Sequence, residues 1–213
     1  MDQGLYRKYF KRVFDNTFAI VLLLITFPIF IISAIAIRLE TKGPALFEQR
    51  RIGKNNEEFL IYKFRTMRVE TEKDGEKLSD SERLTKVGKL LRKTSLDEIP
   101  QCINILKGEM SFIGPRPLPI RYLPYYTEHE ILRHDVLPGV SGLAQIKGRN
   151  LLSWEERFKW DVHYVLNLSL LLDLKILILT ILKVFKKENI VLKDKNPLKD
   201  LNIERSEKIG SGS

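Results

Sequence analysis

The sequence is poor in the residues that form disulfides and zinc sites, since its 213 residues include one cysteine and three histidines. A lone cysteine excludes an internal disulfide, which is typical of a protein in a reducing compartment. Structural zinc sites use four Cys or His ligands of which at least two are cysteines, so one cysteine and three histidines argue against such a site. Cys102 lies in the apolar segment 99–106, which predicts a small buried side chain rather than a nucleophile.

Acidic residues are also in deficit, with 27 Asp and Glu against 36 Lys and Arg and a net charge of +9. A basic chain favours anionic partners, and here we expect anionic membrane lipids and nucleotide phosphates. The sequence has no recognition motif in which aromatic and basic residues alternate, so we expect no nucleic acid partner.

Residues 16–37 contain no charged side chain and would span about 33 Å as one straight helix, enough to cross a bilayer. Pro28 lies in the middle, so we predict that the helix breaks at Thr26, Phe27 and Pro28. Basic residues flank the stretch on both sides: Arg7, Lys8, Lys11 and Arg12 before it, and Arg38, Lys42, Arg50 and Arg51 after it. Short basic flanks prefer the cytoplasmic side. We therefore predict a re-entrant hairpin with both ends cytoplasmic; the alternative is a single crossing with a proline kink.

The rest of the chain predicts a mostly helical α+β fold with a small β-hairpin. Two strands are predicted over 46–51 and 58–64, on either side of a turn at 53–56, and the second shows the alternation typical of a strand. Apolar spacing predicts a helix over 83–93. Residues 69–82 read as a solvated loop. Amphipathic stretches follow at 153–167, whose aromatic residues suit either a core or an interface, and at 168–185, where Asp173 and Lys175 argue against a membrane span. The expected organisation is a surface helix and membrane hairpin over 1–40, a catalytic domain with interfacial helices over 41–190, and a frayed polar tail over 191–213.

Asp97 and Glu98 are the first candidates for chemistry. Either Ser95 caps a helix with Glu98 three residues later, or Pro100 occupies its first turn. Both readings place the pair at a helix N-terminus, where the macrodipole favours negative charge and bound phosphate. An ionised carboxylate there can hold Mg²⁺ or attack phosphorus. The alternative is a solvated first turn without a catalytic role.

Basic residues elsewhere supply cations for a phosphate site: Lys63, Arg65, Arg92, Arg116 and Arg149. Arg116 lies between two prolines and follows Gly114-Pro115, so its backbone is stiff. A stiff segment can pre-place a guanidinium for bidentate phosphate binding.

Four segments in order resemble one known family. They are 62–67 (YKFRTM), 95–101 (SLDEIPQ), 108–117 (GEMSFIGPRP) and 133–145 (RHDVLPGVSGLAQ). The chain resembles the small monotopic phosphoglycosyl transferases that act on polyprenyl phosphates, over residues 5 to 190. Three positions depart from the family pattern. Phe27 stands where a serine precedes the helix-breaking proline, Arg65 stands where some members have lysine and so keeps the charge, and Leu137 stands where an arginine is common.

The resemblance implies a bacterial inner-membrane enzyme on the cytoplasmic face. It would transfer sugar-1-phosphate from a UDP-sugar to undecaprenyl phosphate with Mg²⁺, release UMP, and pass through a covalent enzyme intermediate. Asp97 matches the nucleophile and Glu98 its partner, and both are candidate metal ligands. Arg116 and Pro115 match the substrate-binding Pro-Arg-Pro motif, and Arg92 matches a basic residue before the pair. The competing hypotheses are a transferase without a covalent intermediate and a non-catalytic scaffold that binds anionic lipids.

Overall fold

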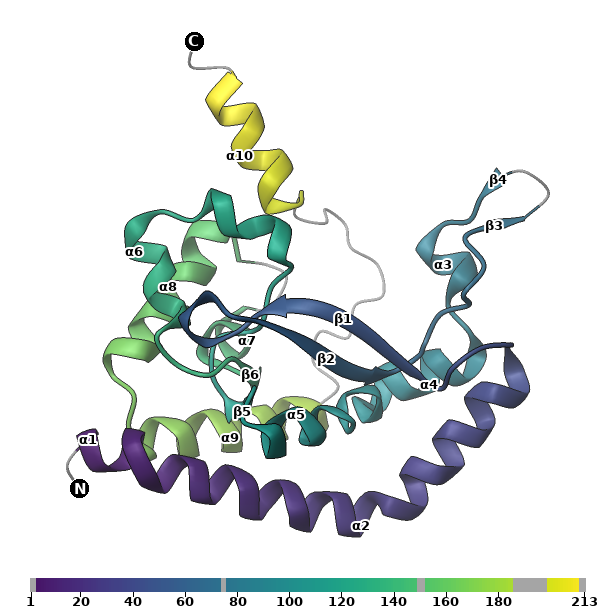
Figure 1. Cartoon of the computed structure of the whole chain (residues 1–213), viewed down its shortest axis with the longest axis horizontal. Coiled ribbons are helices and arrows are strands. Elements are labelled where there is room, and N and C mark those ends of the chain that lie inside the picture. The colour runs from purple at the N-terminus through teal and green to yellow at the C-terminus, as the bar shows by residue number, and fades with distance from the viewer. Residues whose placement is uncertain (1–2, 74–75, 149–151, 186–198, 211–213) are drawn as a thin grey trace. The chain divides into compact units, whose positions relative to one another are not determined.

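The computed structural model describes residues 3–73, 76–148, 152–185 and 199–210. These residues are mostly helical, with two-stranded sheets formed by β1 and β2, by β3 and β4, and by β5 and β6 (Figure 1). The predicted fold class is therefore confirmed. The chain forms two compact units. The dyad unit, which holds Asp97 and Glu98, comprises Asn16–Gln49 and Leu60–Lys107. The terminal unit comprises Met1–Asp15, Arg50–Phe59 and Gly108–Ser213.

The N-terminal segment is one long helical run. α1 (Gln3–Leu5) continues through the π-helical turn η1 (Tyr6–Phe10) into α2 (Lys11–Glu40). The part from Tyr6 to Glu40 is long and apolar enough to cross a membrane, with a mean hydropathy of 3.0 over its most apolar stretch.

Pro28 lies inside α2 and does not end it. The helix bends instead of breaking (Figure 1), because proline cannot donate a hydrogen bond to the carbonyl of Leu24. The Thr26 hydroxyl donates to the Leu22 carbonyl at 2.7 Å, a contact that also favours bending. The expected interruption is thus a bend within a continuous helix, and the re-entrant path stays a prediction.

Both predicted strands are present. β1 (Leu46–Ile52) and β2 (Glu58–Phe64) are joined by the 3-10 turn η2 (Lys54–Asn56). The expectation of little order over 69–82 is wrong in part. β3 (Glu72–Lys73), β4 (Glu76–Lys77) and α3 (Asp80–Arg83) occupy this stretch. Ser79 and Glu82 form a capping box that starts α3.

The dyad unit continues with α4 (Lys86–Thr94), the 3-10 turn η3 (Leu96–Glu98) and α5 (Gln101–Lys107). The predicted helix over 83–93 begins at Lys86 because the Thr85 hydroxyl caps it, accepting from the Gly88 amide at 2.9 Å. The core of the unit contains Ile37, Phe64, Leu91 and Ile99. Cys102 is buried as predicted, and burial raises its thiol pKa to about 11, which disfavours the thiolate.

The terminal unit contains the remaining elements. They are β5 (Ser111–Ile113), η4 (Ile120–Tyr125), α6 (Glu128–Ile131), η5 (Leu132–His134), β6 (Gly139–Ser141), α7 (Leu143–Lys147), α8 (Trp154–Leu166), α9 (Leu170–Phe185) and α10 (Leu201–Gly210). β5 and β6 pair in parallel.

The amphipathic helices of this unit have different environments. On α8, Trp154, Phe158 and Tyr164 are buried. Of the two predicted environments, core and interface, these residues therefore lie in the core. On α9, Ile176 is fully buried. The opposite face of α9 leaves apolar residues exposed, including Leu171 at 79% and Ile178 at 56%. This pattern fits an interfacial helix.

The expected frayed tail is also wrong for the described residues 199–210. Leu201 is fully buried with Tyr122 and Trp154. Arg205 makes a two-pronged ion pair with Glu130, with both contacts at 2.6 Å. α10 is therefore an integral helix of the terminal unit, which its polar composition did not predict.

Candidate active site

Asp97 and Glu98 lie on η3, a single 3-10 turn that follows α4 and precedes α5. Ser95 has a left-handed backbone with φ 57° and makes no side-chain cap, so the first reading of the helix start is wrong. Pro100 instead precedes Gln101, where α5 begins. The carboxylate pair thus stands one turn ahead of the helix rather than inside its first turn. Both side chains are half-buried.

Lys63 holds the second member of the pair. Its ammonium lies 2.6 Å from Glu98 Oε1, and the two side chains are 20% and 21% exposed. A close cation favours the ionised form of a carboxylate. The arrangement therefore provides negative charge on η3 with an adjacent positive charge on β2.

Close packing of α4 on the segment after β2 positions this region. A Cβ added at Gly88 would lie 2.0 Å from the Thr66 carbonyl oxygen, so only glycine permits this approach. The Thr85 amide donates to the same carbonyl at 3.1 Å, and Arg92 Nε donates to the Thr66 hydroxyl at 2.9 Å. Arg92 is thereby oriented on the last turn of α4, just before the dyad.

Asn104 attaches α5 to β2. Its amide nitrogen donates to the Leu60 carbonyl at 2.6 Å, and its oxygen accepts from the Tyr62 amide at 3.0 Å. The fully buried Asn104 side chain thus forms hydrogen bonds with the backbone of β2 that a neighbouring strand would otherwise form. Since Lys63 follows on β2 and Glu98 precedes α5, this contact sets the register of their ion pair. The only sign of this contact in the sequence was an asparagine within the apolar run 102–106.

Arg65 has a structural place. Its side chain is buried and donates to the carbonyls of Thr41 at 3.0 Å and Lys42 at 2.7 Å. Glu40 in turn accepts from the amides of Lys86 at 2.7 Å and Val87 at 2.9 Å. These contacts fasten the end of α2 to the start of α4. We therefore leave Arg65 out of the proposed phosphate site.

Pro115 and Arg116 lie in the terminal unit, on a segment fixed by backbone contacts. A Cβ at Gly114 would lie 2.4 Å from the Leu137 carbonyl, and one at Gly139 would lie 2.1 Å from the Gly114 amide. The Pro115 carbonyl accepts from the Gly139 amide at 2.9 Å. The predicted stiffness of this segment therefore has a physical basis in the packing of two loops. Arg149 lies outside the described residues.

A buried network supports the same segment, and the sequence reasoning missed it. Arg133 is 1% exposed and donates to Asp161 at 2.8 Å and to the Arg116 carbonyl at 2.8 Å. Its other nitrogen contacts His134 Nε2 at 3.1 Å. Because arginine only donates, Nε2 must accept, and the imidazole proton must lie on Nδ1, 2.6 Å from Asn56 Oδ1. Burial and Arg133 lower the His134 pKa to about 3, so the ring is neutral.

Two further arginines lie near Arg116 within this unit. Burial, Arg116 and Arg121 lower the pKa of Arg51 to about 10. Burial, with Arg116 and Arg133, also lowers the pKa of Arg157, whose guanidinium stacks on Trp154 at 4.5 Å. Like charges gathered in a partly buried region are suited to an anionic ligand.

The carboxylate pair also fits the expected metal. The described residues contain no group of three or more His, Cys, Asp or Glu side chains that could hold an ion. In phosphoryl-transfer sites, however, Mg²⁺ is held by one or two carboxylates together with substrate phosphates. Asp97 and Glu98 provide such a donor set.

The sequence from residue 6 to 187 matches the bacterial sugar transferase family. The chain belongs to this family. An uncharacterized sugar transferase of Bacillus subtilis, EpsL, is 51% identical over 180 residues, which make up 84% of this chain and 89% of that protein. The family resemblance drawn from the four motifs is therefore confirmed.

Two other bacterial sugar transferases carry more informative names. A UDP-glucose:undecaprenyl-phosphate glucose-1-phosphate transferase of Klebsiella pneumoniae is 40% identical over 187 residues, 83% of this chain and 40% of that protein. A UDP-N-acetylgalactosamine-undecaprenyl-phosphate N-acetylgalactosaminephosphotransferase of Aeromonas hydrophila is 38% identical over 185 residues, 81% of this chain and 43% of that protein. The chain thus spans most of the Bacillus relative and about two fifths of these two.

Proposed function

We propose that this bacterial sugar transferase moves sugar-1-phosphate from a UDP-sugar to a polyprenyl phosphate such as undecaprenyl phosphate, releasing UMP. The observation that carries the proposal is the Lys63–Glu98 ion pair at 2.6 Å beside Asp97 on η3. It places two adjacent carboxylates and a cation in one half-buried region. The activities for which the Klebsiella and Aeromonas relatives are named support the same reaction class.

The proposed route has two steps. In the first, a carboxylate oxygen of Asp97 attacks the phosphorus that carries the sugar. The bond from this phosphorus to the oxygen that bridges the two phosphates breaks, and UMP leaves with that oxygen. In the second, an oxygen of the polyprenyl phosphate attacks the same phosphorus. The acyl-phosphate bond breaks, Asp97 is restored, and the product is a polyprenyl-diphosphate-linked sugar.

Each neighbouring residue has a proposed role in this route. Glu98, oriented by Lys63, binds metal or moves a proton. Arg92, on the last turn of α4 just before the pair, neutralises phosphate charge. Bound Mg²⁺, held by Asp97 and Glu98, would withdraw charge from the phosphate oxygens. The apolar carrier and the soluble nucleotide meet only at a membrane surface. We therefore propose that the enzyme works at the cytoplasmic face of the inner membrane, with α2 following the re-entrant path.

The first prediction tests the nucleophile. Asp97→Asn should reduce UMP release from UDP-sugars by about a thousandfold or more, because the amide cannot form the covalent intermediate. Asp80→Asn, on the exposed helix α3, is the matched control and should release UMP at the wild-type rate. The assay uses the full chain in detergent with Mg²⁺ and undecaprenyl phosphate.

A trapping experiment separates the alternatives. Incubation with labelled UDP-sugar and no acceptor should leave labelled phosphosugar on the wild-type chain and none on Asp97→Asn. Turnover without labelled protein would instead support direct transfer between two bound substrates. Turnover that is absent for every UDP-sugar, with anionic lipid still bound, would support the scaffold hypothesis.

A further inference from the structure

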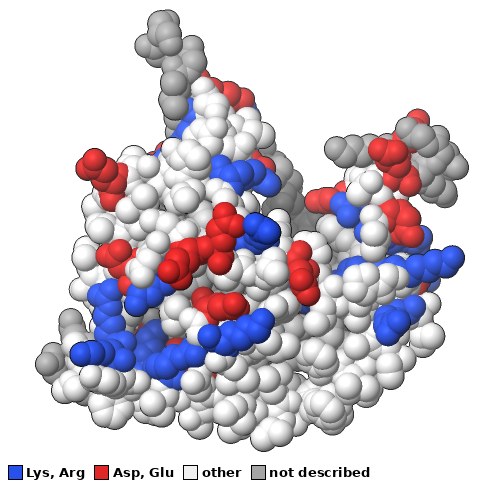
Figure 2. All heavy atoms as spheres, viewed as in Figure 1, with Lys and Arg blue, Asp and Glu red and all other residues white. Residues whose placement is uncertain are grey.

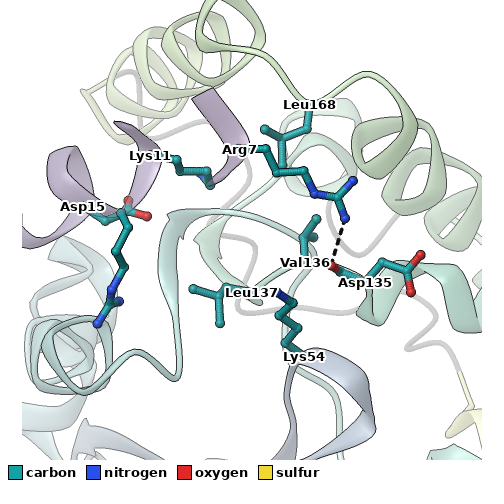
Figure 3. A pocket seen from close by; sticks show the side chains of 9 residues that line it. Arg7, Lys11, Asp15, Lys54, Asp135, Val136, Leu137 and Leu168 are labelled. Atoms are coloured by element: carbon teal, nitrogen blue, oxygen red, sulfur yellow. Dashed lines mark hydrogen bonds between the residues drawn. The ribbon is translucent and has the colours of Figure 1, made fainter. Parts of the chain in front are cut away.

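A small basic cavity lies within the terminal unit, beside the first turns of the N-terminal helix (Figure 3). Its volume is about 80 Å³, several times what one water molecule needs. Four lining residues are basic and two are acidic: Arg7, Lys11, Arg12, Lys54, Asp15 and Asp135. The space is sufficient for one phosphate group.

The charges that face this cavity do not cancel. The Lys11 ammonium is bound to Asp173 at 2.6 Å. The Asp135 carboxylate points away from the cavity, and its backbone oxygen accepts from Arg7 at 3.0 Å (Figure 3). Asp15 is the remaining acid, and it also accepts from the Phe112 amide at 3.1 Å. Arg7 and Lys54 therefore face the cavity opposite one remaining carboxylate, that of Asp15.

Two of these cations are well placed to contact a ligand. The Asp135 carbonyl takes one of the five N–H donors of Arg7 and holds the guanidinium in place. Lys54 extends from the η2 turn, and its amine points toward Val136 and Leu137 (Figure 3). An anion between them would receive charge from both sides.

The helical turns beside the cavity also expose apolar side chains. The same helical turns that carry Arg7 and Arg12 expose Phe10, Val13 and Phe14, at 45%, 62% and 54% of their surface. Figure 2 shows Lys and Arg side chains gathered near the N-terminal end of the chain. A soluble anion would use only the basic part of this surface, whereas an amphiphile would use both parts.

We propose that the cavity binds the phosphate headgroup of an anionic membrane phospholipid. Arg7 and Lys54 contact the phosphate, and Phe10 and Val13 contact the acyl chains. The site goes beyond the transfer reaction, since a bilayer lipid there is neither donor nor acceptor. It would fix the depth and rotation of the N-terminal helix in the headgroup layer.

The test uses native mass spectrometry of the full chain in detergent, with equal amounts of phosphatidylglycerol and phosphatidylcholine and no UDP-sugar. The wild-type chain should retain phosphatidylglycerol preferentially. Arg7→Gln and Lys54→Gln should each lower this preference about fivefold, the factor expected for one cation near a membrane surface. The matched controls are Arg50→Gln and Lys159→Gln, which should keep the wild-type ratio. Lys54 is exposed, so its variant remains informative if Arg7→Gln does not fold.

Four results would overturn the proposal. They are equal retention of the two lipids by the wild-type chain, a wild-type ratio in both cavity variants, displacement of phosphatidylglycerol by millimolar inorganic phosphate, and displacement by an equimolar amount of undecaprenyl phosphate. The third result would indicate a free-anion site, and the fourth an acceptor site. Because lipid retention is measured without turnover, its failure leaves the proposed transfer reaction untouched.

Discussion

Two titratable side chains, one in each unit, lie next to a cation with opposite consequences for their own charge. Glu98 is half-buried and receives its charge partner from Lys63. His134 is buried beside the cation Arg133 and stays neutral, because its Nε2 accepts while its Nδ1 donates. The first arrangement pairs an anion with a cation beside the proposed nucleophile Asp97. The second supports the loop that carries Arg116 and creates a pH-dependent contribution to stability.

At the residue scale, His134 should make the chain less stable in acid. Its folded pKa of about 3 lies below the ordinary value of 6.5. Below pH 6.5 the unfolded chain therefore binds a proton that the folded chain does not. The contribution is complete above pH 6.5 and is lost as pH falls toward 3, by about 1.4 kcal/mol per pH unit. Denaturant unfolding at pH 7.5 and 5.5 measures the loss.

His134→Gln is the matched variant, since its amide can accept from Arg133 and does not titrate. The difference in unfolding free energy between the two pH values should be smaller in this variant by about 1 kcal/mol. An equal pH dependence in the two proteins would show that His134 protonation is not linked to folding.

Helices and strands are held around the dyad by a few close contacts. Gly88 allows α4 to approach Thr66, and Asn104 joins α5 to β2. The lengths of these elements follow from local patterns: the sequence predicted β1 and β2 to within one residue, and α4 with a start three residues too early. Their docking depends on contacts between distant residues. For this reason the structural role of Arg65 and the cap that Glu40 supplies to α4 could not be predicted, whereas local motifs were enough to name Asp97 and Arg92 as candidates.

At the element scale, Gly88→Ala should separate α4 from the segment after β2. The new methyl group would meet the Thr66 carbonyl, and such overpacking costs about 2 kcal/mol. Alanine has a higher helix propensity than glycine, so a loss of stability in this variant could not come from helix propensity. Lys89→Ala, at the next and exposed position, should leave the melting temperature unchanged. Thermal melting in detergent measures both, and equal stability of wild type and Gly88→Ala would contradict the close approach.

At the scale of the whole chain, an ion pair joins segments more than 150 positions apart. Asp173 on α9 accepts from Tyr6 and Tyr164, each at 2.7 Å, and binds Lys11 at 2.6 Å. The sequence showed that Asp173 interrupts an apolar helix, but not which residue neutralises it. The packing of α10 could not be predicted either. Its polar composition resembles that of a free tail, and its buried contacts come from only two residues, Leu201 and Arg205.

Asp173→Asn should destabilise the terminal unit by about 3–5 kcal/mol, because Lys11 would remain buried without its counter-charge. Adding Lys11→Met should recover more than half of this loss, since the double variant buries no charge at this position. Glu207→Gln breaks the exposed pair with Lys199 and should cost less than about 1 kcal/mol. Denaturant unfolding in detergent measures all three. No recovery in the double variant would mean that the tyrosine contacts, rather than the ion pair, dominate.

The way α2 ends has a practical consequence for inhibitor discovery. Glu40 caps the start of α4, and Arg65 binds the carbonyls that follow the helix. Cutting away α2 to obtain a water-soluble fragment would also remove the Glu40 cap of α4 and the carbonyls that Arg65 binds. The segments that hold the carboxylate pair would then lose these contacts. Compounds directed at this enzyme are therefore best sought on the intact chain in detergent or nanodiscs.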